Sequence, residues 1–254
     1  MKDVTAAGVV VTMPTMTSRL RFLLSVLAML VLGVILYRSG GSIWRPVFAE
    51  VKENKTVKSV VAETVAAGKG LTAEEEEEAA ALVLIGLKEE RELEVWLTDD
   101  EGNHRKIRSY PFTAFSGKSG PKLREGDLQI PEGIYEIEYL NPQSRYHLSI
   151  KLDYPNAFDR KKGAEEDREF LGGDIFIHGR AVTIGCIPIG DDAIEDLFTI
   201  VSQIGKSNVQ TIIAPRDFRT SREFPEIAPV DWEEELYLGI EEALDPFREV
   251  GDQG

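Results

Sequence analysis

The sequence has little cysteine and little histidine, with one cysteine and three histidines among 254 residues. A single thiol excludes an intrachain disulfide framework, although it leaves the redox compartment open. Thiol–disulfide exchange within the chain is also disfavoured, because no second cysteine is present to resolve a mixed disulfide. The one cysteine therefore needs an explanation other than a disulfide.

Basic residues are also scarce. The chain has 29 lysines and arginines against 44 aspartates and glutamates, a formal net charge of −15. Because nucleic-acid binding requires concentrated positive charge, this balance argues against a nucleic-acid partner. With an anionic polymer we expect only local, peptide-directed contacts. A hydrophobic fraction of 43% is enough for a sizeable core. The length suits one domain of roughly 130 residues with flanking pieces.

A long uncharged run occurs only near the N-terminus. Residues 22–37 are sixteen residues without a charge, with arginines on both sides. We expect a transmembrane signal-anchor, because neighbouring apolar and aromatic residues extend the run towards the ~20 residues that a spanning helix needs. Residues 1–21 would then be cytoplasmic. A cleaved signal peptide is the alternative, although the small-residue site at 47–49 lies far beyond the run. A buried soluble helix is a third interpretation.

Residues 38–86 are predicted to form a linker with helical segments. Aromatic residues are few here, and Gly68 and Gly70 break the stretch. The acidic run Glu74–Glu78 follows Thr72, and acidic residues favour the N-terminal end of a helix. We interpret this run as a solvated helix face, with a cation site as the alternative.

From residue 87 the pattern changes to short strands. Apolar and polar residues alternate, with turn residues between the runs, which predicts a β-rich catalytic domain over 87–216. Helical spacing appears at 194–204 and again at 232–248. The second helix is expected to pack on the sheet within a C-terminal piece, 217–254, that ends in an acidic tail. The expected strands are 93–97, 106–110, 134–139, 146–152 and 209–214.

The only cysteine, Cys186, stands eight positions after His178. A predicted strand over 174–177 delivers His178 at its end, and Gly179 opens a turn. An imidazole that meets a thiol lowers the thiol pKa, and the thiolate is a nucleophile. The pair is therefore a candidate for nucleophilic catalysis. The alternative is a buried apolar cysteine beside a core histidine.

Glycine precedes the candidate nucleophile. Gly185 lets the backbone pass close to a substrate, and the N–H groups of Gly185 and Cys186 are predicted to hold an oxyanion. Thr183 is interpreted as a hydrogen-bond partner of the backbone beside the thiol. The next helix is expected to begin with a capping box formed by Asp192 and Glu195.

The pattern His-Gly followed by Thr-x-Gly-Cys resembles the signature of the L,D-transpeptidase catalytic domain family of the YkuD type, and within it the YafK-like branch. Further segments match this branch in order, so that the resemblance covers about residues 87–214 and, more loosely, the helix at 232–247. These segments are 116–122, 125–135, 141–142, 146–149 and 154–160.

The resemblance implies a mainly β fold with flanking helices, the β-sandwich catalytic fold of the family. It also implies acyl transfer through a Cys186 thioester on peptidoglycan stem peptides, after meso-diaminopimelate, outside the cytoplasmic membrane and without a cofactor. The alternative is a hydrolase of the same family that releases meso-diaminopimelate-linked peptide or a wall-linked lipoprotein.

Two positions depart from the family pattern. Many members have a second histidine where this chain has Ile184, and an arginine where it has Pro188. His178 is then the only nearby candidate for the base, and the usual way of binding the substrate peptide is in doubt. These departures motivate a second alternative, a catalytically silent wall-binding module.

Supporting residues are assigned by their chemistry. Arginine and lysine side chains suit the carboxylates of a stem peptide. A tyrosine and an asparagine beside a proline either shape the cleft or form a turn. His147 supplies a second imidazole or is a half-exposed strand residue. A zinc site from His147, His178 and Cys186 is a remote alternative, and we expect no metal. The candidate substrate-binding residues are Arg160, Tyr154, Asn156, Lys118 and Lys122.

Overall fold

The computed structural model describes residues 55–221, 223–225 and 230–248. The predicted cytoplasmic segment 1–21 and membrane anchor 22–37 lie outside these residues. Among the helices of the described ranges, none has the length and apolar character needed to cross a bilayer.

An eight-stranded mixed sheet forms the centre of the described chain, in the order β3-β2-β1-β8-β4-β5-β6-β7. Neighbouring strands are antiparallel except for two parallel pairs, β1 with β8 and β6 with β7. The strands are β1 (Ala81–Leu87), β2 (Glu92–Thr98), β3 (His104–Pro111), β4 (Gly133–Asn141), β5 (Ser149–Leu152), β6 (Phe176–His178), β7 (Ile187–Pro188) and β8 (Val209–Ala214).

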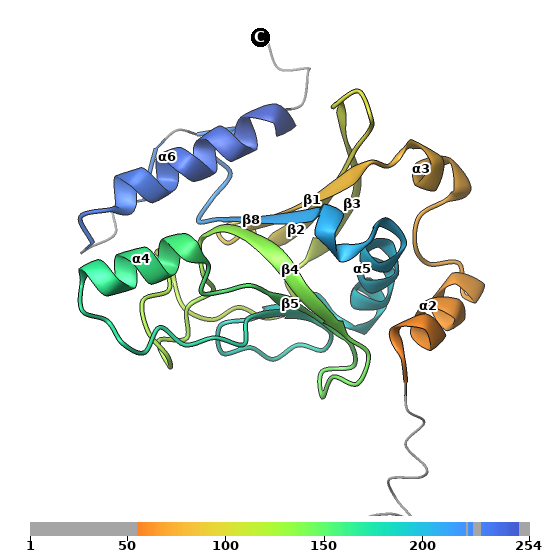
Figure 1. Ribbon diagram of the computed structural model, residues 1–254, viewed down its shortest axis with the longest axis horizontal. Helices are drawn as coiled ribbons and strands as arrows, with labels where there is room; N and C mark the ends of the chain where they lie inside the picture. Colours follow the sequence, from red (N-terminus) through yellow and green to blue (C-terminus); the bar gives the residue numbers. More distant parts are fainter. Residues whose placement is uncertain (1–54, 222, 226–229, 249–254) are drawn as a thin grey trace, which may run out of the picture. The chain divides into compact units, whose positions relative to one another are not determined.

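Helices cover both faces of this sheet (Figure 1). Helices α2 and α5 lie on one side, while α4 and α6 lie on the other. The helices are α2 (Val57–Ala66), α3 (Ala73–Glu78), α4 (Ala157–Glu165), α5 (Asp191–Ile204) and α6 (Glu233–Leu244), with 3₁₀ turns η1 (Lys206–Asn208) and η2 (Asp245–Phe247).

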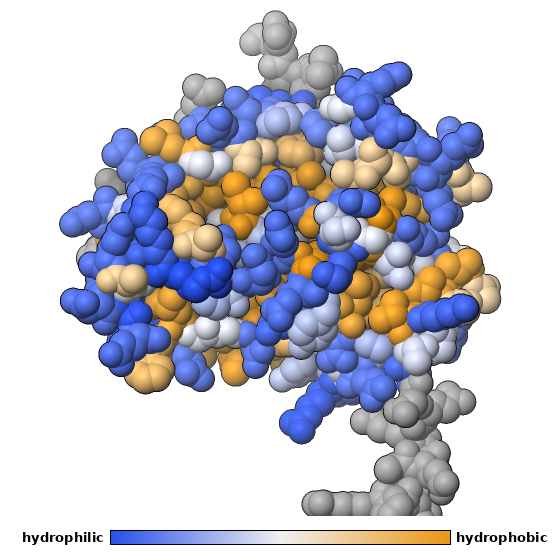
Figure 2. Space-filling view, viewed as in Figure 1, coloured by the Kyte–Doolittle hydropathy of each residue, from blue (hydrophilic) through white to orange (hydrophobic). Residues whose placement is uncertain are grey.

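The apolar run of β1 explains why this strand is central. Successive residues of β1 alternate between two cores. Leu82 and Leu84 pack with α5, while Val83 and Ile85 pack with α6. A strand that is buried on both faces is continuously apolar instead of alternating. On the surface of the view in Figure 1, hydrophilic side chains predominate and apolar ones show between them (Figure 2).

Strand β4 joins the two parts of the sheet. Strand β4 pairs with β8 through its first residues and with β5 through its last residues, so that one sheet continues across it. The register shifts between Ile137 and Tyr139, and such a bulge bends and twists a strand. The described fold is therefore a mixed, sheet-dominated one with flanking helices, as predicted, and the sandwich packing of its two parts stays a prediction.

Residues 55–86 belong to the folded unit and are not a linker to it. Val60 of α2 lies in the core, and the Thr64 hydroxyl meets the Thr199 hydroxyl of α5 at 2.6 Å. The predicted helix start at Thr72 is confirmed by a capping box with Glu75. The Glu75 carboxylate also accepts from Arg108 of β3 at 3.0 Å, so this acidic residue of the run is not a solvated one.

The helix predictions hold with one correction. Helix α5 buries the expected apolar face, and α6 buries Trp232, Leu236, Ile240 and Leu244 as expected. However, α5 begins at Asp191 after Gly190 and has no side-chain cap. The predicted capping box of Asp192 and Glu195 is therefore wrong, because both carboxylates pair with Lys69 instead.

Candidate active site

The parallel pair β6–β7 places the histidine and the cysteine on neighbouring segments of the sheet. Ile177 pairs with Ile187 and His178 pairs with Pro188, and Cys186 directly precedes β7. Side chains two residues apart in a strand point to the same face. Cys186 and His178 therefore lie along one face at the end of the sheet, as their spacing predicts. The returning segment runs parallel to β6, so the connection between them is a loop and not a tight hairpin.

The imidazole of His178 is buried, with 1% of the residue exposed. Its Nδ1 lies 2.5 Å from the carbonyl oxygen of Gly179. A carbonyl only accepts, so Nδ1 carries the proton and the lone pair is on Nε2. Burial lowers the pKa of His178, and the bond to Gly179 offsets part of this effect. The site therefore holds a neutral imidazole with Nε2 as the basic atom.

The Cys186 thiol is only partly exposed. Its Sγ lies 3.6 Å from the carbonyl oxygen of Asp174. Burial is the main cause that raises the pKa of Cys186. The charge of Asp174 adds to it, while the Phe176 backbone and the Lys122 charge oppose it. The thiol is therefore protonated at neutral pH. Among the described residues no hydrogen bond joins it to His178, so at rest the thiol and the imidazole are both neutral.

The backbone amides next to the thiol already have a partner. The N–H groups of Cys186 and Gly185 donate to the Thr183 hydroxyl oxygen at 2.8 and 3.1 Å, and that hydroxyl donates to the Cys186 carbonyl at 2.7 Å. The expected hydrogen bonding of Thr183 is confirmed. The two amides predicted to form the oxyanion hole are thus not free in this structure.

Two glycines are required by close approaches. Gly185 has a φ of 127°, and a Cβ there would lie 2.9 Å from the carbonyl oxygen of Gln129. At Gly179 a Cβ would lie 2.6 Å from an Asp191 carboxylate oxygen and 2.7 Å from the Tyr146 carbonyl. Gly185 thus lets the chain pass close to the loop that contains Gln129. The prediction assigned this close approach to a substrate instead.

An aromatic ring that the sequence did not point to covers the histidine. Tyr146 stacks on His178 with ring centroids 4.6 Å apart and planes tilted by 32°. Its neighbour His147 turns the other way, with Nε2 at 2.6 Å from Glu195 Oε1. The structure therefore gives His147 to Glu195 of α5 and not to the thiol. In the described part of the chain, no group of three or more His, Cys, Asp or Glu side chains is arranged to hold a metal ion.

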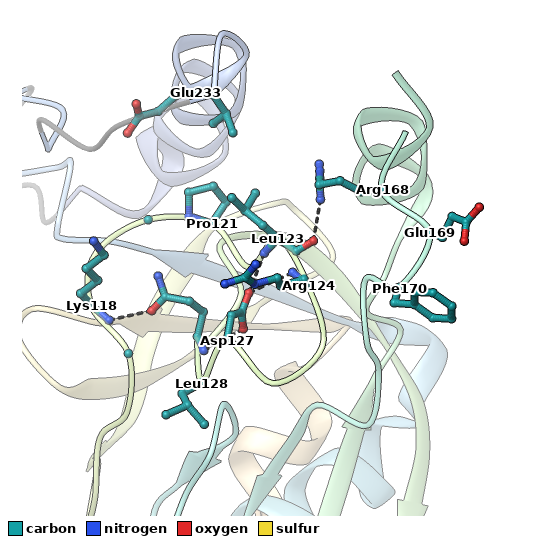
Figure 3. A pocket seen from close by; sticks show the side chains of 14 residues that line it. Lys118, Pro121, Leu123, Arg124, Asp127, Leu128, Arg168, Glu169, Phe170 and Glu233 are labelled. Atoms are coloured by element: carbon teal, nitrogen blue, oxygen red, sulfur yellow. Dashed lines mark hydrogen bonds between the residues drawn. The ribbon is translucent and has the colours of Figure 1, made fainter. Parts of the chain in front are cut away.

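A cleft of about 810 Å³ opens beside the Gln129 loop (Figure 3). Its walls come from residues 117–129, from residues 168–170 and from the start of α6. The two loops are joined by the bond from Glu125 N–H to the Phe170 carbonyl, 2.9 Å. Lys118 and Arg124 lie on the first loop, while Phe170 lies on the second, 73% exposed. Neither Arg124 nor Phe170 was predicted from the sequence, since neither belongs to a recognisable pattern.

The other candidate substrate-binding residues have structural partners. Lys122 is buried and pairs with Asp127 at 2.5 Å. The buried Tyr154 hydroxyl donates to the Lys122 and Leu171 carbonyls. Asn156 caps α4, which agrees with the turn alternative, and exposed Arg160 donates to the Pro155 carbonyl. Of the five, only Lys118 lines the cleft.

The comparisons with known proteins concern the domain that contains these residues. The model of the L,D-transpeptidase catalytic domain (YkuD) matches residues 81–214. Two curated proteins named "Putative L,D-transpeptidase YafK", from Escherichia coli strain K12 and from O157:H7, are each 37% identical over 133 residues, which is 50% of this chain and 51% of theirs. The chain therefore spans about half the length of the curated relatives it matches.

Solved structures with a similar course of the chain come from two bacteria. The helical cell shape determining protein Pgp2 from Campylobacter jejuni is 21% identical, with a TM-score of 0.44 over 73% of this chain and 61% of that one. Bd1075 from Bdellovibrio bacteriovorus is 22% identical, with a TM-score of 0.38 over 70% of this chain and 58% of that one.

Proposed function

Because this chain belongs to the L,D-transpeptidase catalytic domain family, which its match over residues 81–214 shows, we propose that it is a cysteine acyltransferase acting on peptidoglycan stem peptides. The observation that carries the proposal is the pairing of β6 with β7. It sets the only thiol of the chain and a buried imidazole along one face of the sheet.

The chemistry follows from the protonation states of the site. As Cys186 Sγ attacks the amide carbonyl of a stem peptide, its proton passes to His178 Nε2. The same proton then goes to the leaving amine, and a thioester remains on Cys186. An incoming amine or water attacks the thioester. The proton that it loses passes through His178 to the departing Cys186 thiolate. The amine gives a new peptide link, while water gives hydrolysis.

The oxyanion role of the Gly185 and Cys186 amides stays a prediction. Both N–H groups donate to Thr183 in the resting site, so they can bind an oxyanion only if the Thr183 hydroxyl gives way or shares them. A donor in this position is worth about 2.7–4 kcal/mol in other enzymes. The occupied amides are the observation that supports the alternative of a silent wall-binding module.

The cleft provides for a substrate with carboxylates and an extended backbone. Lys118 and Arg124 place two cations at its walls, in a chain whose net charge is −15. Neither has an ion-pair partner among the described residues, and a guanidinium suits a carboxylate. Leu128 and Phe170 add apolar contacts. We assign the peptide to this cleft, with its scissile carbonyl at the Gly185 end.

We also propose that the catalytic unit acts in the periplasm and that residues 22–37 hold it at the cytoplasmic membrane. The uncharged run with flanking arginines supports this location. Carbonate extraction of membranes and protease accessibility of the catalytic unit in spheroplasts test it. Release of the intact full-length chain by carbonate would contradict the anchor.

Incubation of purified protein with sacculi tests the reaction. Wild type, Cys186→Ala and His178→Ala are compared on cross-linked and on lipoprotein-bearing peptidoglycan, with products identified by mass. The matched control is His104→Ala, because His104 lies on β3, where its ring contacts Thr98 and Phe247. New links that depend on Cys186 indicate transpeptidation, whereas lost links or released lipoprotein indicate hydrolysis. If no product depends on Cys186, the enzyme proposal fails.

A further inference from the structure

Tyr146 separates the candidate base from solvent. Its ring lies against the imidazole of His178 at 4.6 Å, and Tyr146 is 41% exposed while His178 is 1% exposed. The phenol hydroxyl has no partner among the described residues, so the ring contact is what this side chain supplies to the site.

The backbone beside this ring is held in an unusual conformation. His147 has a φ of 75°, in the left-handed region that residues other than glycine rarely adopt. Such a conformation persists only where surrounding contacts impose it. The contact here is the 2.6 Å hydrogen bond between His147 Nε2 and Glu195 Oε1. The other Glu195 oxygen pairs with Lys69 at 3.0 Å.

Helix α5 fixes the far end of this connection. Glu195 lies between Ile194 and Leu197, which are completely buried in the main core. The Tyr146 carbonyl is fixed too, since Gly179 approaches it so closely that a Cβ would lie 2.7 Å away. The turn that carries Tyr146 is thus held from α5 on one side and from the chain after His178 on the other.

We propose that the His147–Glu195 hydrogen bond positions Tyr146 on His178, and that the ring keeps the imidazole dry and in one orientation. Tyr146, His147 and Glu195 are positioning residues that act through His178. The inference rests on the proposed function only in taking His178 as the base.

The charged groups around this arrangement define the controls. On the His147 side they are Glu195, with Lys69 and Asp192 behind it. On the Gly179 side Asp191 accepts from the Arg180 N–H at 2.7 Å. Asp192 lies on the same helix as Glu195 and also pairs with Lys69. Among the described residues it makes no contact with His147. Asp192→Ala is therefore the matched control for Glu195→Ala.

Proton NMR titration of the three imidazoles in the full chain tests the proposal, with the His178 signal identified by its loss in His178→Ala. Tyr146→Ala should move the His178 midpoint upwards by about half a pH unit or more, because it admits water to the ring. Tyr146→Phe should keep the wild-type midpoint. Glu195→Ala and His147→Gly should shift it in the same direction as Tyr146→Ala.

Glu195→Gln should keep the midpoint, since an amide oxygen still accepts from His147, and Asp192→Ala should keep it as well. His147→Gly separates the contact from backbone strain, because glycine accepts the left-handed φ but makes no bond to Glu195. A wild-type midpoint in both Glu195→Ala and His147→Gly would overturn the proposal. The titration needs no substrate, so this outcome is distinguishable from a failure of the acyltransferase proposal in the sacculus assay.

Discussion

The protonation state of the Cys186–His178 pair can be tested through the chain's single thiol. Burial raises the pKa of Cys186 above its ordinary value of 9.0 and lowers the pKa of His178 below 6.5. Both groups are then neutral between these values. A preformed thiolate–imidazolium pair has the opposite signs, with the thiol pKa lowered to about 3.5–7.5. Alkylation by iodoacetamide distinguishes the two, because only the thiolate reacts.

The expected difference is large. A thiol with a pKa of 9 is about 1% thiolate at pH 7, and each further unit lowers this fraction tenfold. The alkylation rate of the wild-type protein should therefore rise by about 100-fold between pH 7 and pH 9, with no plateau in between. A preformed ion pair would change the rate by no more than about fourfold over the same range.

The measurement is the rate constant for loss of the free thiol, followed by mass from pH 5 to pH 10. Because the chain has only one cysteine, no second site interferes. The chain unfolded in denaturant gives the unperturbed thiol as a reference. His178→Ala should leave the steep rise in place. A plateau below pH 8 in the wild type that His178→Ala abolishes would refute the neutral pair and with it the order of proton transfer given above.

Three further predictions concern the support of the site. Thr183→Val removes three hydrogen bonds around the thiol and should cost about 1–3 kcal/mol of unfolding free energy; Thr183→Ser should restore most of it in urea denaturation. Lys88→Met leaves the Glu132 carboxylate buried without its ion-pair partner and should cost about 3–5 kcal/mol, whereas the double variant with Glu132→Leu should cost less. A larger loss in the double variant would contradict this. Burial raises the pKa of Asp159 from 3.8 to about 6, so the folded state binds the carboxyl proton more tightly than the unfolded state does. The stability that this protonated carboxyl contributes is lost as pH rises from about 4 to 6. Asp159→Asn should remove up to about 3 kcal/mol of that decline, and equal pH dependence in both proteins would show the carboxyl to be unperturbed.

Local patterns in the sequence were sufficient for most of the elements. Strand β8 and the apolar faces of α5 and α6 follow from the periodicity of single segments. Periodicity did not reveal that β4 continues one sheet, because strand pairing joins residues far apart in the chain. It also did not show that residues 55–86 belong to the fold, since α2 buries only Val60 and Thr64 and becomes part of the core through its contact with α5.

The candidate site residues were predictable for the same reason. His178, Gly179, Thr183, Gly185 and Cys186 lie within nine positions, so their types and spacing are visible in one segment. Their electrostatic state was not. Whether the thiol is charged depends on burial, on the charges of Asp174 and Lys122 and on the Phe176 backbone, and these groups meet only in the folded chain.

The sequence by itself determined the family and the candidates for nucleophile and base, because these depend on residue type and short-range order. Tertiary structure decided which charges are available and which side chains shape the site. Lys122 forms a buried ion pair with Asp127, while Arg124 lines the cleft. His147 is hydrogen-bonded to Glu195, and the Tyr146 ring stacks on His178. The physical reason is that solvent exposure and hydrogen-bond partners come from packing between elements, and no single segment of the chain contains them.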